Sequence, residues 1–144
     1  MVHALQKAAS CLNSGGIILE VHDLVDPPRI EVHSSESEIF AGQLLSDKNF
    51  ENQRLADQAI GQVIEDGLLL SDQALVFEYF IRADSFDSLT EWLDEDWESA
   101  YIPEGTRQKA VDLIAQSGEG SEVVLRMVSR LTMLKPTPNI IFPS

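Results

Sequence analysis

The sequence predicts an α/β domain, α+β by content, in which helices pack on a three-stranded mixed sheet. Helical and extended patterns alternate along its 144 residues. Three runs have the β-branched and aromatic composition that is typical of strands. The hydrophobic fraction of 44% is sufficient for a core in a chain of this length.

Residues Met1 to Leu12 predict an amphipathic helix, because apolar side chains recur on one stripe: Val2, Leu5, Ala8 and Leu12. The glycines of the segment Asn13 to Gly16 end this helix, since glycine tolerates positive φ. Ile17 to Val21 then predicts a short strand that is buried on both faces. The strand ends by Asp26-Pro27-Pro28, because proline cannot donate a ladder hydrogen bond.

The segment from Arg29 to Asn49 is polar and irregular. We expect a long loop there, with one short helix around Ile39 to Leu45. A second helix is predicted from Phe50 to Glu65, with Gly67 as its C-cap. The apolar stripe of this helix consists of Leu55, Ala59, Ile60, Val63 and Ile64.

Two further strands flank a helical insert in the second half of the chain. Residues Ala74 to Arg82 are aromatic and β-branched, which predicts a strand. Ser85 is the expected N-cap of the first inserted helix, and Pro103 stands where the second begins. The last strand, Glu122 to Leu134, is the longest.

We find no internal repeat and no domain boundary in the sequence. The expected organisation is one domain over residues 1–135 and a tail over residues 136–144, since Pro136 and Pro138 end regular structure.

The net charge of −14 restricts the partners that the protein is expected to bind. An acidic surface repels phosphate backbones and anionic lipids, so we expect neither nucleic-acid nor membrane binding. No apolar run approaches the roughly 20 residues that span a bilayer, and the N-terminus lacks the features of a signal peptide. Cys11 is the single cysteine and cannot form an internal disulfide, which favours a cytoplasmic location.

The sequence contains no motif for phosphate binding or nucleophilic catalysis. Gly15-Gly16 precedes a strand, so it cannot place amides at a helix N-terminus around an anion. Cys11 lies on or near the apolar face of the first helix, which favours a small core residue over a nucleophile. The catalytic residues are therefore unknown.

Two acidic groupings are interpreted as solvated surface. His22, Asp23 and Asp26 could offer metal ligands at a strand end, but their spacing matches no compact metal template, so we expect no metal. The acidic run from Asp94 to Glu98 is typical of an exposed helix face, and the neighbouring Trp92 is expected to pack, as is Trp97.

The succession of these elements resembles the C-terminal half of S-adenosylmethionine-dependent methyltransferases with a Rossmann-like fold. Leu5 to Leu24 is similar to the stretch through the family's fifth strand, where a helix ends in a leucine-x-x-Gly-Gly turn. Leu12-Asn13-Ser14-Gly15-Gly16 matches that turn. Leu75 to Arg82 looks like the sixth strand of the family, and Val123 to Leu134 looks like the seventh.

The resemblance implies a strand order of five, seven, six, with the seventh strand antiparallel. It implies no cofactor-binding residue here, because the family's glycine-rich loop and ribose-binding acid precede the matched region. S-adenosylmethionine is expected only if a partner supplies the site. The loop after the fifth strand often shapes the family's substrate pocket, which makes His33, Phe40 and Phe50 candidate residues on the substrate side.

A sheet that begins at the fifth strand has one unpaired edge, and such an edge favours pairing with another chain. We expect a homodimer, or a complex with a chain that carries the missing half, through Ile17, Ile18, Leu19, Glu20 and Val21.

The expected function is that of a methyltransferase-like interaction or structural protein without its own S-adenosylmethionine site, inactive alone. The alternative is the C-terminal half of a split methyltransferase that is active with a partner chain. A small-molecule binding module is a third hypothesis. Without the resemblance, the element pattern predicts only a small α+β domain of unknown role.

Overall fold

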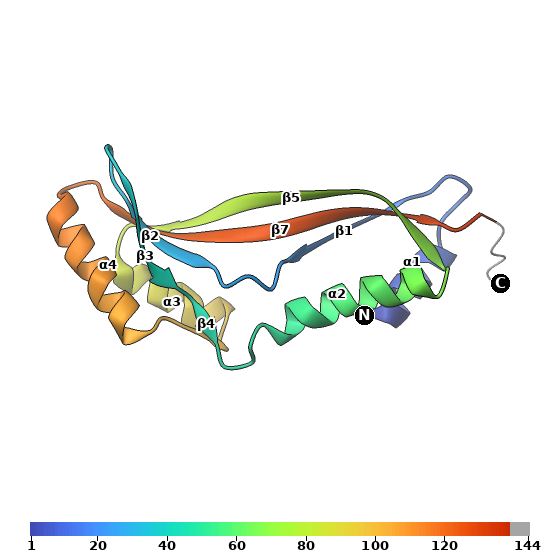
Figure 1. Cartoon of the computed structure of the whole chain (residues 1–144), viewed down its shortest axis with the longest axis horizontal. Coiled ribbons are helices and arrows are strands. Elements are labelled where there is room, and N and C mark those ends of the chain that lie inside the picture. The colour runs from blue at the N-terminus through green and yellow to red at the C-terminus, as the bar shows by residue number, and fades with distance from the viewer. Residues whose placement is uncertain (139–144) are drawn as a thin grey trace. The chain divides into compact units, whose positions relative to one another are not determined.

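The structure is a computed structural model that describes residues 1–138 (Figure 1). It belongs to the α+β class, and in the described part an antiparallel sheet of five strands accompanies four helices. The elements are α1 (Val2–Ser10), β1 (Ile18–Asp23), β2 (Arg29–His33), β3 (Glu38–Gln43), β4 (Leu45–Ser46), α2 (Glu51–Glu65), β5 (Leu69–Ala83), α3 (Phe86–Asp96), β6 (Ala100–Tyr101), α4 (Glu104–Ser117) and β7 (Glu122–Pro136). The α+β content is confirmed, whereas the expected three-stranded mixed sheet is corrected to five antiparallel strands.

The long strand β7 organises the sheet (Figure 1). Its residues 129–134 pair antiparallel with β1, and its residues 122–126 pair antiparallel with β2. β3 pairs with β2, while β4 and β6 form a separate two-stranded sheet. β5 also pairs with β7.

β1 and β5 lie on opposite edges of β7. Ion pairs join β5 to β7 near both ends, Asp72 to Lys135 and Arg82 to Glu122, so the two strands run side by side along their length. A strand can pair along only two edges. β5 pairs along one edge of β7, so β1 pairs with residues 129–134 along the other edge. The local order is therefore β1–β7–β5.

The described residues cluster into two compact units. The first contains Met1–Val25, Glu51–Phe77 and the chain from Ser129, and the second contains Asp26–Phe50 and Glu78–Val128. β5 and β7 each contribute residues to both units. Of the expected tail, residues 139–144 lie outside the described part, and β7 continues to Pro136.

In the first unit, α1 and α2 cover one face of the strands. The shared core consists of Leu5, Ala9, Ala59, Ile60, Val63, Leu69 and Leu134. The buried stripe of α2 includes Ala56, while Leu55 is 50% exposed. The expected stripe was therefore wrong by one position at its N-terminal end, where the buried residue is Ala56 and Leu55 faces outward.

In the second unit, α3 and α4 pack against β2, β3 and β7. The core consists of Ile30, Val32, Ala41, Leu44, Phe86, Leu89, Leu93, Ala100, Ala110, Val123, Leu125 and Met127. The predicted cap of α3 is confirmed, because the Ser85 side chain accepts a hydrogen bond of 3.1 Å from the backbone N–H of Ser88.

The prediction of a long loop with a short helix between Arg29 and Asn49 was wrong. This segment forms β2, β3 and β4. Ile30 and Val32 point into the core, and Val32 lies in register with Val123 of β7. Ser34 closes the β2–β3 turn, since its hydroxyl accepts from the backbone N–H of Ser37 at 3.2 Å. Pairing with distant β7 thus decides the structure of a segment whose local sequence is polar.

Candidate functional site

The first candidate site is the outer edge of β1, where the sequence predicted a pairing edge. Ile17 directly precedes this strand, and the other four predicted residues lie in it. Among the described residues, β1 pairs with β7 alone. The outer edge therefore presents backbone groups that no described strand covers, which is the arrangement that permits strand addition.

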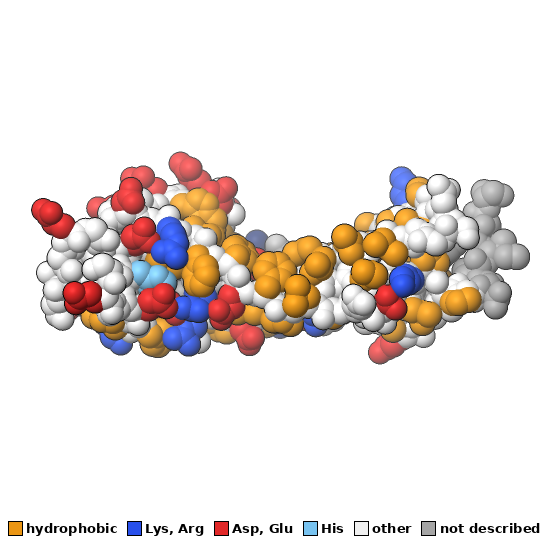
Figure 2. Space-filling model, turned by 90° about the horizontal axis from the view of Figure 1, so that it is seen from above, with side chains coloured by type: hydrophobic (Ala, Val, Ile, Leu, Met, Phe, Trp, Pro, Cys, Tyr) orange, Lys and Arg blue, Asp and Glu red, His pale blue; other side chains and the backbone are white. Residues whose placement is uncertain are grey.

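The outer face of the first unit's sheet is apolar and open (Figure 2). Leu19 is 59% exposed and Val21 is 56% exposed, and they lie in register with Met133 and Leu131 of β7. A shallow groove of about 490 Å³ runs along this face, lined by Leu19, Gln73, Ala74, Leu75, Leu131 and Met133. The prediction that β1 is buried on both faces was wrong, because α1 and α2 cover only the inner face.

The inner face of β1 carries a polar cluster instead of the solvated strand end that we expected at His22. The side chain of His22 is only 9% exposed and lies between two carboxylates. Its Nδ1 is 2.9 Å from Glu20 Oε1, and its Nε2 is 3.1 Å from Asp57 Oδ1 on α2. Arg130 of β7 donates to the same Asp57 oxygen.

The three residues considered as metal ligands at this strand end do not come together. His22 and Asp23 are neighbours in a strand, so their side chains point to opposite faces. Asp23 accepts a hydrogen bond from Ser129, and Asp26 is exposed beyond the strand.

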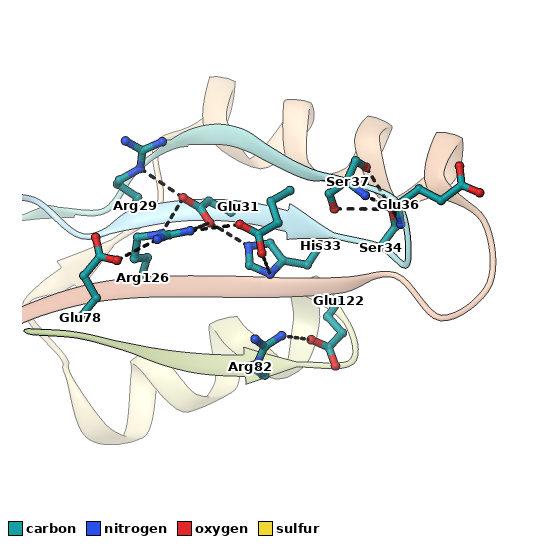
Figure 3. Close-up of polar contacts among 11 residues, drawn as sticks. Arg29, Glu31, His33, Ser34, Glu36, Ser37, Glu78, Arg82, Glu122 and Arg126 are labelled. Atoms are coloured by element: carbon teal, nitrogen blue, oxygen red, sulfur yellow. Dashed lines mark hydrogen bonds and ion pairs between the residues drawn. The ribbon is translucent and has the colours of Figure 1, made fainter.

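A second polar cluster lies in the second unit and centres on Arg126 of β7 (Figure 3). Its guanidinium donates from Nε to Glu31 Oε1 and from Nη2 to Glu31 Oε2, both at 3.0 Å. It also reaches Glu78 Oε2 at 2.9 Å and Glu38 Oε2 at 3.3 Å. Arg126 therefore joins carboxylates from β2, β3 and β5.

Glu31 is the buried member of this cluster, with 3% of its surface exposed. Its carboxylate also contacts Nε of Arg29 at 3.2 Å and Nε2 of His33 at 2.8 Å. Burial raises the pKa of Glu31, but the hydrogen bonds from Arg126 and His33 outweigh it and hold the pKa below its usual range. The same bond to Glu31 raises the pKa of Arg126.

Glu31, His33 and Glu38 offer ligand atoms within 4.8 Å of one another, a spacing compatible with a metal ion. However, Arg126 bonds to both Glu31 and Glu38 from the same nitrogen, Nη2, and so supplies a positive charge between them. A divalent cation there would be repelled by the guanidinium. The geometry suits an internal ion-pair network better than a metal centre.

The three residues predicted on the substrate side all lie in the second unit but have different surroundings. His33 belongs to the Arg126 cluster. Phe40 is 41% exposed, and Arg29 stacks over its ring at 4.7 Å from the ring centroid. Phe50 is buried and packs edge-to-face on Trp97 at 5.9 Å. A role for these residues at a substrate stays a prediction.

Two further expectations can be compared with the structure. Cys11 was expected in the core, but it follows the end of α1 and is exposed. Trp92 and Trp97 pack against the second core, and the acidic residues of the run Asp94 to Glu98 are exposed, as predicted.

Comparison with known proteins found no matching family, no matching curated protein and no matching solved structure. Within residues 1–138, no helix is long and apolar enough to cross a membrane. The interpretation of function therefore depends on the strand edge, the apolar face and the order of the strands.

Proposed function

We propose that this chain is an interaction module built on a methyltransferase-like sheet, and that it pairs through β1 with a strand of another copy. In this proposal the chain is cytoplasmic and has no S-adenosylmethionine site of its own. The observation that carries the proposal is the outer edge of β1, which has no partner among the described strands and is bordered by the exposed Leu19 and Val21.

The order of the strands supports the methyltransferase-like part of the proposal. In the first unit β7 lies between β1 and β5 and runs antiparallel to β1. This agrees with the order five, seven, six that the sequence resemblance implies, if β1, β7 and β5 correspond to those three strands. α1 and α2 precede β1 and β5 and share one face of the sheet.

Two energetic terms favour association at this edge. Complete burial of a Val or Leu side chain is worth roughly 1.5–3 kcal/mol, and each copy offers both residues about half exposed. Each new backbone hydrogen bond adds about 1 kcal/mol net. These gains must exceed the entropy lost on association and the repulsion between two chains of charge −14.

Size-exclusion chromatography with light scattering tests this proposal. Wild-type protein is expected to be a dimer at micromolar concentration. The double variant L19K/V21K places charges on the apolar border of the edge and is expected to be monomeric. L55K is the matched control, because Leu55 is 50% exposed in the same unit but lies on α2. A wild-type monomer at these concentrations would exclude the homodimer.

A split methyltransferase is the alternative function, in which a different chain supplies the strands beyond β1. The open edge is compatible with this hypothesis also. Both hypotheses leave the isolated chain without a cofactor site, and they differ in whether β1 pairs with a second copy or with a different chain. Calorimetry with S-adenosylmethionine and S-adenosylhomocysteine tests the premise that they share. The interaction module should show no binding, whereas micromolar affinity of the isolated chain would contradict it.

A further inference from the structure

A small pocket of about 320 Å³ lies on the inner face of the first unit, between α2, β5 and β7. It is independent of the strand edge, and neither hypothesis above uses it. Its polar walls come from Asp57, Ser71, Arg130 and Thr132, and its apolar walls from Ile60, Ile64 and Ala74. The volume is at the lower end of the range for small-molecule sites.

Asp57 and Arg130 form the charged end of the pocket and retain unused hydrogen-bonding capacity. All contacts of Asp57 use its Oδ1, which accepts from Arg130 and lies 3.1 Å from His22 Nε2. Arg130 uses only Nη2. The contacts of this pair within residues 1–138 leave Asp57 Oδ2 and the Nε and Nη1 of Arg130 unused, and the two side chains are 37% and 30% exposed. The pocket thus presents a carboxylate beside a guanidinium, each able to bind a further group.

A buried hydroxyl in the same wall also lacks a partner. Thr132 is only 3% exposed, and its Oγ1 makes no hydrogen bond in the described part of the chain. Buried polar side chains are paired in most proteins, so this hydroxyl is an exception, and since its oxygen is buried we assign it no ligand contact.

Gly61 of α2 is part of the pocket lining. It lies inside a 15-residue helix, where glycine is less favourable than alanine. A Cβ added at Gly61 would meet no atom within 4 Å, so packing does not require glycine there. A larger side chain at this position would begin in open space at the pocket lining.

We propose that this pocket binds a small aliphatic α-amino acid as its zwitterion. Arg130 receives the carboxylate, Asp57 receives the ammonium group, and the side chain lies against Ile60, Ile64 and Ala74. The two charges of an amino acid are on adjacent groups, as are the guanidinium and the carboxylate of the pocket. A simple anion is repelled by Asp57 and a simple cation by Arg130, which favours a ligand that carries both charges.

Calorimetric titration of the full chain with L-leucine tests the proposal. Two analogues each keep one charge: 4-methylpentanoate lacks the ammonium group, and 3-methylbutylamine lacks the carboxylate. We expect saturable binding of leucine and binding at least about tenfold weaker for each analogue, since each loses a charge-assisted hydrogen bond. Absence of saturable heat with leucine up to tens of millimolar, or equal affinity for an analogue, would overturn the proposal.

Two variants connect binding to this pocket. G61L should fill the entrance and D57N should remove the partner of the ammonium group, and each is expected to weaken leucine binding at least about tenfold. D72N is the matched control: it removes the same charge from an exposed ion pair with Lys135 in the same unit and should leave the affinity unchanged. Circular dichroism confirms that each variant folds. Unchanged binding in folded G61L and folded D57N would contradict the site. G61L and D72N change residues outside β1, whereas D57N removes a contact of His22 on its inner face, so G61L is the variant whose result is separate from the test of the dimer.

Discussion

Arg126 and Glu31 form a two-pronged ion pair in which Nε meets Oε1 and Nη2 meets Oε2, both at 3.0 Å. The Glu31 side chain is 4% exposed and that of Arg126 is 20% exposed. A bidentate pair at this depth is geometrically specific, and removal of either partner leaves a poorly solvated charge. The pair joins β2 to β7. The residues near Glu31 in the sequence do not predict that β2 pairs with β7.

The lowered pKa of Glu31 predicts a loss of stability in acid. A carboxyl group whose pKa is lower in the folded than in the unfolded state stabilises the fold above the unfolded value, about 4.3. That contribution is lost as the pH falls from there through the folded pKa. E31Q should therefore lower the free energy of unfolding at pH 7 by about 1–3 kcal/mol and reduce its decline in acid.

Urea denaturation at pH 7 and at several acidic pH values measures both effects. E36Q is the matched control, because Glu36 is an exposed carboxylate in the β2–β3 turn. If E31Q and E36Q show the same dependence of stability on pH, the buried pair does not stabilise the fold.

A double-mutant cycle should reveal coupling between Glu31 and Arg126. R126M leaves the buried Glu31 carboxylate without its main partner, and we expect a loss of about 3–5 kcal/mol. In E31Q/R126M no buried charge is left unpaired, so the double variant should be more stable than the sum of the single losses predicts. Urea unfolding of the four proteins measures the coupling, and additive losses would contradict it.

Gly42 of β3 is predicted to be essential for the packing of α4. A Cβ at this position would lie 2.1 Å from Oγ1 and 2.6 Å from Cγ2 of Thr106. G42A should therefore destabilise the protein by about 1–3 kcal/mol. G105A, on the same helix as Thr106, would meet no atom within 4 Å and should be neutral or stabilising. Thermal unfolding distinguishes the two, and an equal melting temperature for both variants would refute the close contact.

Salt should strengthen the proposed dimer. Two chains of charge −14 repel each other, while the border of the β1 edge is apolar at Leu19 and Val21. Higher ionic strength screens the repulsion and leaves burial of these side chains unaffected. The dissociation constant from analytical ultracentrifugation should fall as sodium chloride increases. A constant that rises with salt would indicate an interface formed by ion pairs instead.

The sequence predicts the four helices and the presence of β1, β5 and β7, because their signals are local, although β5 begins at Leu69 and not at Ala74. Ser85 provides a cap for α3, and the apolar, β-branched run from Ile17 marks β1. These signals depend on neighbours within a few residues. The expected boundaries of α2 and the expected start of α3 accordingly agree with the structure to within a residue.

The β2–β3 hairpin and the Arg126 cluster could not be predicted in this way. Glu31 and His33 give β2 a polar composition, and only their alternation with Ile30 and Val32 suggests a strand. Arg126 lies 95 positions from Glu31 in the chain, so their contact depends on the pairing of β2 with β7. The Asp57 pocket likewise requires α2 to lie over β7, which no local pattern specifies.

Residue-resolved hydrogen exchange of β1 is the most direct test of the proposed pairing. In an edge strand, alternate amides point to the neighbouring strand and to the open edge. We predict that the outward-pointing amides among residues 18–23 exchange rapidly in dilute protein and become protected as the concentration rises, while those bonded to β7 stay protected throughout. L19K/V21K should show no such change. Two results would contradict pairing through β1. In the first, the wild-type protein is dimeric but its outward-pointing amides stay unprotected. In the second, the protein does not dimerise at any concentration.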